Sequence, residues 1–330
     1  MNGESAREAA HRPPTGGRTL FRIWRHGDLV SDVLLRLSSI AVVTLVGLIG
    51  YELWLHSAES RLAFGLQFLV TAQWDPALRQ VFGALPFIQG TLVTSLVALV
   101  IALPMGLGTA IFLAEMAPRW LRQPVGFLVE MLAAVPSVVY GLWGLFAFIP
   151  IFVRPLALGL NDSLGFLPVF AGPVFGPSRL AASLVLTIMI LPTIAAVSRD
   201  VFSAIPQSQR EAALALGATH WEMISQVLVP YGLSGFLGAA VLALGRALGE
   251  TMAVTMVIGN TLDLSSSLLH PGYTMASLIA NEFTEATNSL YLSALIEIGL
   301  VLFFITLILN FLARLLVWRV SQRATGEARA

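Results

Sequence analysis

Two residues of opposite charge, Arg246 and Glu250, lie inside a long apolar stretch of the sequence. On a helix they share a face, because side chains four residues apart lie one above the other. An ionised side chain at the centre of a bilayer costs on the order of 2.5–3.5 kcal/mol, so we expect both to face the interior of a helical bundle or a wet cavity. The planar donor group of Arg246 suits bidentate contact with phosphate or sulfate, and Glu250 would compete with that anion and keep its binding weak.

The alternative is a structural pair in which the two charges only neutralise each other. On a helix such a pair is worth about 0.2–0.5 kcal/mol, and Arg before Glu is the weaker order. This gain is too small to explain two charges in an apolar stretch, so an anion path is favoured. Glu297, in the last apolar stretch, lies at a depth similar to Glu250 and is a further candidate. It either joins Arg246 or serves as an interfacial carboxylate.

The residue types that are missing exclude several kinds of chemistry. The chain has no Cys, which excludes disulfides, thiolate metal sites and nucleophilic thiols. Its five His residues are scattered without ligand spacing, so we expect no metal site. It contains no Lys, which a phosphate-cradling P-loop requires. Because no nucleophile, base and acid are grouped either, we predict that the chain is not an enzyme, has no catalytic residues and binds no cofactor itself.

The composition predicts an all-α integral membrane protein. Of the 330 residues, 56% are hydrophobic and 12% are charged, which is more apolar than a soluble domain of this length requires. A membrane-spanning helix needs about 20 mostly apolar residues. Six stretches qualify and predict a six-helix transmembrane bundle: residues 33–55, 88–114, 125–153, 180–198, 231–259 and 291–318. Prolines inside or near the ends of these stretches are expected to kink or interrupt some helices.

The arginines predict how the bundle is oriented. Short loops with many basic residues stay in the cytoplasm, and 14 of the 19 arginines precede or enter the first stretch, lie near the end of the last stretch or after it, or lie between stretches two and three or four and five. Both termini are therefore expected in the cytoplasm. We divide the chain into a polar, disordered N-terminal extension over residues 1–32, a transmembrane domain over 33–319 with a cytoplasmic loop over 199–230, and a tail over 320–330.

The loop contains a polar, amphipathic segment between two apolar stretches. A helix is predicted from about Gln209 to Leu216, where Ala212 and Ala213 give a small-residue face, and Gly217 can adopt the left-handed conformation that turns the chain. The simple alternative is an amphipathic helix lying on the membrane surface. The segment from 211 to 230 resembles the EAA motif of ABC importer permeases in Glu211, Ala212, Ala213, Gly217 and Pro230. That resemblance implies docking to a partner ATPase.

Three further stretches carry a closer resemblance, which covers most of the chain outside the N-terminal extension. They are FLVTAQWDPALRQVFGALPFIQGTLVTS at 68–95, AAVPSVVYGLWGLF at 133–146 and ALGRALGETMAV at 243–254. Together they resemble the PstC-type permeases of phosphate-specific ABC importers. The resemblance implies an inner-membrane channel subunit paired with a PstA-type permease, two PstB-type ATPases that use ATP and Mg, and a periplasmic or lipid-anchored phosphate-binding protein. The family's phosphate-path Arg and Glu fall on Arg246 and Glu250.

Two other functions compete with a phosphate importer. A permease for sulfate or molybdate would use the same Arg, although the stretches at 133–146 and 243–254 favour phosphate. An ion-coupled secondary carrier would use Glu250 and Glu297 for coupling, but it would leave the EAA-like segment without a role.

Overall fold

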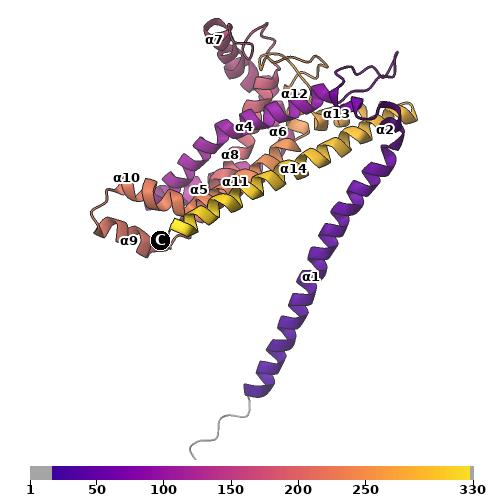
Figure 1. Ribbon diagram of the computed structural model, residues 1–330. Coiled ribbons are helices and arrows are strands. Elements are labelled where there is room, and N and C mark those ends of the chain that lie inside the picture. The colour runs from indigo at the N-terminus through magenta and orange to yellow at the C-terminus, as the bar shows by residue number, and fades with distance from the viewer. Residues whose placement is uncertain (1–16, 328–330) are drawn as a thin grey trace, which may run out of the picture. The chain divides into compact units, whose positions relative to one another are not determined.

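The computed structural model describes the backbone of residues 17–327 and the side chains of residues 31–319 and 322. Within these residues the regular structure is helical, apart from two isolated β-bridges, Asp75 with Val81 and Gly259 with Gly272. Contacts divide the chain into a first unit that ends at Glu52 and a second unit that begins at Leu53. Figure 1 colours both units along the chain.

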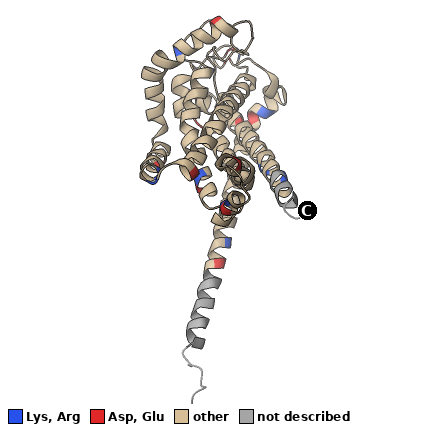
Figure 2. Ribbon diagram, turned by 90° about the vertical axis from the view of Figure 1, so that its left-hand side faces the viewer, with Lys and Arg blue, Asp and Glu red and all other residues tan. Residues whose placement is uncertain are grey.

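Six helices among the described residues are long and apolar enough to cross a membrane. They are Ser31–His56, Leu85–Met116, Ser137–Leu164, Arg179–Ser203, His220–Leu248 and Ser289–Arg319. The predicted six-helix membrane protein is therefore confirmed. In Figure 2 charged residues colour only short pieces of the helices, and most of the ribbon is tan.

The first unit consists largely of helix α1 (Gly17–His56). The helix starts inside the extension that was expected to be disordered over residues 1–32; residues 1–16 of that extension lie outside the described part. The sequence contains no Pro between residues 15 and 75, so nothing there prevents a helix from continuing backward from the apolar stretch. At the other terminus, α14 (Ser289–Glu327) continues into the predicted tail over 320–330.

The second unit is built around helix α8 (Arg179–Ser203), which packs against α4 (Leu85–Ile111) and α11 (Val229–Leu248). Small residues recur on α4 every four positions and are all buried: Ala98, Ala102, Gly106 and Ala110. A Cβ on Gly106 would lie 2.6 Å from Ile194 Cγ2 on α8. This row lets two apolar helices approach closely, which is how helices associate in lipid.

The third membrane helix differs from the prediction. The sequence favoured one span over residues 125–153, but helix α5 (Arg119–Ala133) is separate, and the span begins at Ser137 with α6 (Ser137–Trp143). It continues through the π-helical segment η3 (Gly144–Val153) into α7 (Arg154–Leu164). The break has a local cause, because Pro136 has ψ 139°, an extended conformation that ends the preceding helix. With 15 residues, α5 is about 22 Å long and too short to cross a bilayer.

A second core explains the tryptophan-containing stretch before α4. Trp74, Phe82 and Phe87 are buried together with residues of α13 (Met275–Glu282) and α14. Glu282 Oε2 accepts hydrogen bonds from Trp74 Nε1 at 2.8 Å and from the Tyr291 hydroxyl at 2.6 Å. The segment before α4 thus packs against α13 and α14, and the buried indole N–H of Trp74 has its acceptor on α13.

Candidate functional site

The fifth membrane helix is followed by a break in the helical backbone and then by a short helix. It begins at α10 (His220–Glu222), inside the predicted loop over 199–230, and continues through η4 (Met223–Leu228) into α11. It ends at Leu248, and after a break at residues 249–251 the short helix α12 (Met252–Val257) follows. Both predicted bounds of the fifth span, 231 and 259, are therefore wrong. Gly249, the residue after α11, has the low helix propensity that permits this ending.

The break overturns the predicted shared face of Arg246 and Glu250. Arg246 lies in the last turn of α11, whereas Glu250 lies beyond its end and serves the next helix: Oε1 accepts a hydrogen bond from Ala253 N at 3.2 Å. Within the described part of the chain no ion pair joins the two residues. The Thr251 hydroxyl donates to the Gly249 carbonyl at 3.2 Å. Side chains of the break itself thus satisfy part of its backbone, as membrane depth requires.

Arg246 is half-buried and faces helix α8. Its Nη1 donates to Thr193 Oγ1 at 3.3 Å, and Thr193 lies near the middle of α8. Tyr140 of α6 lies within electrostatic range of Arg246, and its hydroxyl donates to the Leu132 carbonyl at 2.8 Å, across the break between α5 and α6. The sequence analysis did not identify Thr193 as a site residue. A hydroxyl directly after Pro192, inside an apolar span, was the feature that could have marked it.

The two stretches at 133–146 and 243–254 meet in space. Helix α6 packs against α12 without room for a side chain, because a Cβ on Gly141 would lie 2.6 Å from Met256 Sδ and 3.1 Å from Ala253 Cα. One turn later, a Cβ on Gly144 would lie 3.0 Å from Val257 Cγ1. This packing holds α12, which follows the break at residues 249–251, against α6, which follows the break at Pro136.

The arrangement can bind an anion weakly. Arg246 is permanently charged, has a neutral hydroxyl as its hydrogen-bond partner and makes no ion pair with a described carboxylate. Irregular backbone at membrane depth is tolerated where it is buried in protein or lines a wet cavity. A charge without a carboxylate partner, beside two broken helices, is therefore suited to a tetrahedral oxyanion that binds and leaves.

Glu297 does not join this group. It is 5% exposed on α14 and lies beside Ser60 and Arg61 of α2 (Ala58–Phe64). Because α14 packs against α2 along this face, Glu297 is surrounded by protein. Its position argues against the suggested network with Arg246.

The EAA-like residues lie on a helix, a turn and a second helix, as predicted. Glu211, Ala212 and Ala213 are on α9 (Gln207–Ala215), and Gly217 has φ +89°, which favours glycine. Glu211, Ala212 and Gly217 are exposed, and Pro230 is near the start of α11. Around the turn, three large apolar side chains are exposed to solvent: Leu214, Leu216 and Trp221. An exposed apolar cluster of this kind is typical of an interaction surface.

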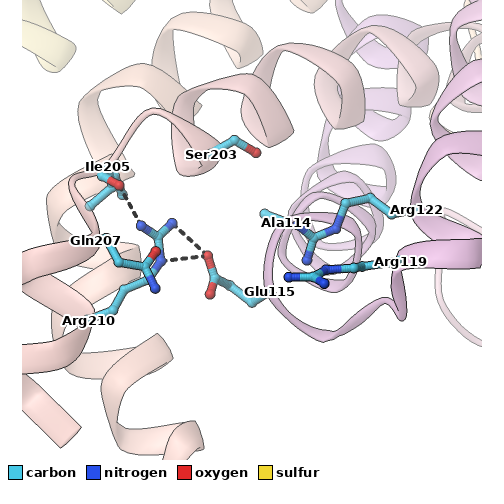
Figure 3. A pocket seen from close by; sticks show the side chains of 8 residues that line it. All are labelled: Ala114, Glu115, Arg119, Arg122, Ser203, Ile205, Gln207 and Arg210. Carbon is cyan, nitrogen blue, oxygen red and sulfur yellow. Dashed lines mark hydrogen bonds and ion pairs between the residues drawn. The ribbon is translucent and has the colours of Figure 1, made fainter.

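An ion pair that the sequence did not predict holds α9 in place. Arg210 on α9 donates to Glu115 Oε1 from Nε at 3.0 Å and from Nη2 at 2.7 Å, and both side chains are about nine-tenths buried. Glu115 belongs to the π-helical segment η2 (Phe112–Met116) at the end of α4. Arg210 also donates to the backbone carbonyl of Ile205 (Figure 3) and to that of Phe202, near the end of α8. One guanidinium thus joins α9 to two membrane helices.

Comparison with known proteins supplies the family. The family model described as "Binding-protein-dependent transport system inner membrane component" matches residues 103–324, more than half of the chain. The chain belongs to this family. The match includes Arg246, the break at 249–251 and the whole segment from α9 to α11.

Members of this transport family with high sequence similarity span nearly the whole chain. A "Phosphate transport system permease protein PstC" of Mesorhizobium japonicum is 43% identical over 90% of this chain and 91% of its own length. One of the same name from Haemophilus influenzae is 48% identical over 87% of this chain and 91% of its own length.

Solved structures of ABC transporters share the fold. A chain of a bacterial alginate ABC transporter aligns over 91% of this chain and 98% of its own length, with a TM-score of 0.58 and 17% identity. A chain of the MetNI methionine ABC transporter in an inward-facing conformation aligns over 75% and 99%, with a TM-score of 0.54 and 18% identity. At these identities the likeness concerns the fold alone. The chain is thus a multi-pass membrane permease of the ABC importer type.

Proposed function

We propose that this chain is the channel-forming membrane subunit of an ATP-driven importer of inorganic phosphate. The observation that carries this proposal is Arg246, a charged side chain without a carboxylate partner at the break of a membrane helix, in a chain whose relatives at 43–48% identity are named phosphate permeases. Sulfate and molybdate offer the same tetrahedral geometry to Arg246, so they are the anions against which specificity must be measured.

In this proposal Arg246 and Glu250 have separate tasks. Arg246 contacts the anion in transit, and Thr193 holds the guanidinium toward α8 between passages. Glu250 caps the start of α12 by accepting a hydrogen bond from Ala253 N. It lies four residues after Arg246, and its negative charge disfavours prolonged binding of the anion. Weak binding suits transport, since a substrate must leave as readily as it enters.

The ATPase acts through α9. The exposed apolar residues around Gly217 form the surface on which a PstB-type ATPase docks, and movement of the docked ATPase displaces α9. Because Arg210 binds both η2 and the end of α8, α4 and α8 move with it. Helix α8 carries Thr193, so the displacement reaches the partner of Arg246 along one continuous helix.

An importer of this kind requires further subunits. The chain pairs with a PstA-type permease, two PstB-type ATPases bind on the cytoplasmic side with ATP and Mg, and a phosphate-binding protein delivers the anion from the opposite side. The end of the bundle that carries α9 faces the cytoplasm, and the membrane is the bacterial inner membrane.

The test is uptake by proteoliposomes that contain the assembled complex, with the binding protein and phosphate outside and ATP inside. We expect phosphate to accumulate, and we expect an ATPase subunit that cannot hydrolyse ATP to abolish that accumulation. Sulfate and molybdate, offered with their own binding proteins absent, serve as specificity controls. Accumulation of phosphate by this chain without the ATPase would refute the proposal in favour of an ion-coupled carrier.

A further inference from the structure

A cavity of about 550 Å³ lies at the end of the second unit that carries α9. Figure 3 shows its lining, which comes from the end of η2, the first turn of α5, the end of α8 and α9. Three of the lining residues are arginines and one is an acid: Arg119, Arg122, Arg210 and Glu115. The lining side chains therefore carry a surplus of two positive charges.

The surplus belongs to Arg119 and Arg122. Arg210 is fully engaged, because it donates to Glu115 and to the carbonyls of Phe202 and Ile205. Among the described residues, no hydrogen bond or ion pair involves the side chain of Arg119 or of Arg122. In Figure 3 both of their guanidinium groups are directed across the cavity toward Glu115. The nearby Arg199, in contrast, is paired with Glu130 at 2.8 Å and Asp200 at 2.9 Å.

The placement of these two arginines is unfavourable without a ligand. They occupy the first turn of α5, where the helix dipole repels cations. They are also three residues apart, so two like charges lie on one face. The preference of basic residues for the cytoplasmic side accounts for their presence at this end. It does not account for two unpaired guanidinium groups that line one cavity.

We propose that this cavity binds a phosphate group, either as inorganic phosphate or as the headgroup of an anionic phospholipid. Two planar guanidinium groups can each make bidentate hydrogen bonds to phosphate oxygens, and such charge-assisted bonds are the strong ones. Ser203 and Gln207 add a hydroxyl and an amide to the lining. Since a water molecule occupies about 30 Å³ in the liquid, the cavity accommodates a hydrated phosphate or a phosphate ester.

The location gives such a ligand an effect on the permease. An anion held by α5 in a cavity that η2, α8 and α9 also line would bridge the elements that Arg210 joins. A ligand shifts a conformational equilibrium only through its different affinity for the two states. The binding site itself does not depend on which anion is transported, so it can be tested by binding alone.

The experiment uses the assembled complex in nanodiscs, without nucleotide or binding protein, and compares wild type with Arg119→Gln/Arg122→Gln. In nanodiscs of neutral lipid, equilibrium dialysis with radiolabelled phosphate measures the free anion. In nanodiscs that contain phosphatidylglycerol, mass spectrometry of the intact complex measures retained lipid. Arg154→Gln, an exposed arginine on α7, is the matched charge control. Arg246→Gln separates binding at the cavity from binding in the transport path.

We expect the double variant to lower affinity for at least one probe by roughly tenfold or more, while Arg154→Gln leaves it unchanged. Loss of phosphate binding identifies the free anion, and loss of retained lipid identifies the headgroup. Equal binding of both probes by the double variant and by Arg154→Gln would overturn the proposal. It would also be overturned if the double variant released the ATPase while wild type bound neither probe, since the arginines would then serve an acidic protein surface.

Discussion

Arg210 and Glu115 form a nearly buried ion pair between residues 95 positions apart in the sequence, with Nη2 at 2.7 Å and Nε at 3.0 Å from the same carboxylate oxygen. The pair connects the helix proposed to receive the ATPase with the end of α4. Because Arg210 also binds two carbonyls at the end of α8, it is the point at which α9, α4 and α8 are joined.

Removing either partner of this pair should weaken the complex strongly. We expect Arg210→Gln and Glu115→Gln each to destabilise it by about 3–5 kcal/mol, because each leaves a buried charge unpaired. The double variant should cost less than the sum of the two, since it buries no lone charge. Thermal unfolding of the purified complex measures all three variants, with Arg154→Gln as control. Costs that simply add would show that the two residues act independently.

The turn after α9 should depend on the backbone of Gly217. At φ +89° any other residue is strained by about 1–3 kcal/mol, and nothing lies within 4 Å of the position that a Cβ would occupy. We expect Gly217→Ala to reduce association with the ATPase while membrane insertion stays normal. Gly108→Ala is the matched control, because its Cβ also meets nothing within 4 Å and its position in α4 is helical. Undiminished ATPase binding by Gly217→Ala would show that the turn is not required.

The contact between α6 and α12 should tolerate no side chain at Gly141. A methyl group there would lie 3.1 Å from Ala253 Cα, which is backbone and cannot move away as the Met256 side chain can. We expect Gly141→Ala to cost about 1–3 kcal/mol and to impair uptake. Gly159→Ala on α7, where a Cβ has open space, should affect neither property. Normal stability and uptake for Gly141→Ala would contradict the close approach of these helices.

Thr193 should matter through its hydroxyl. Thr193→Val keeps the shape of the side chain but removes the acceptor for Arg246 Nη1. We expect uptake to fall by about tenfold or more, because hydrogen bonds to charged groups contribute about 1.5–3 kcal/mol. Thr193→Ser keeps the hydroxyl and should restore most of the rate. If Ser and Val gave equal losses, packing and not the hydrogen bond would be responsible.

Hydropathy predicted the six membrane helices, and the spacing from Glu211 to Gly217 predicted the helix and turn that carry the EAA-like residues. The breaks were harder to predict. Pro136 was a visible interruption inside the apolar stretch over 125–153, but no proline or comparable stop signal stands at Gly249. Glycines are common in membrane helices, so their presence alone does not mark an end.

Long-range contacts account for what the sequence could not supply. Glu115 lies in η2 and Arg210 in α9, and only the fold brings them together. Glu297 was placed near Arg246 by depth alone, whereas the rotation of α14 turns it toward α2. Depth follows from counting residues, but the direction in which a side chain points depends on how the helices pack.

The most direct test of the proposed path is phosphate uptake by proteoliposomes that contain equal amounts of assembled wild-type or Arg246→Gln complex, with Arg154→Gln as control. Arg246→Gln keeps a hydrogen-bond donor for Thr193 but removes the charge that would attract the anion. We expect Arg246→Gln to assemble normally and to lose nearly all ATP-dependent uptake, while Arg154→Gln transports like wild type. Undiminished uptake by Arg246→Gln would remove Arg246 from the anion path.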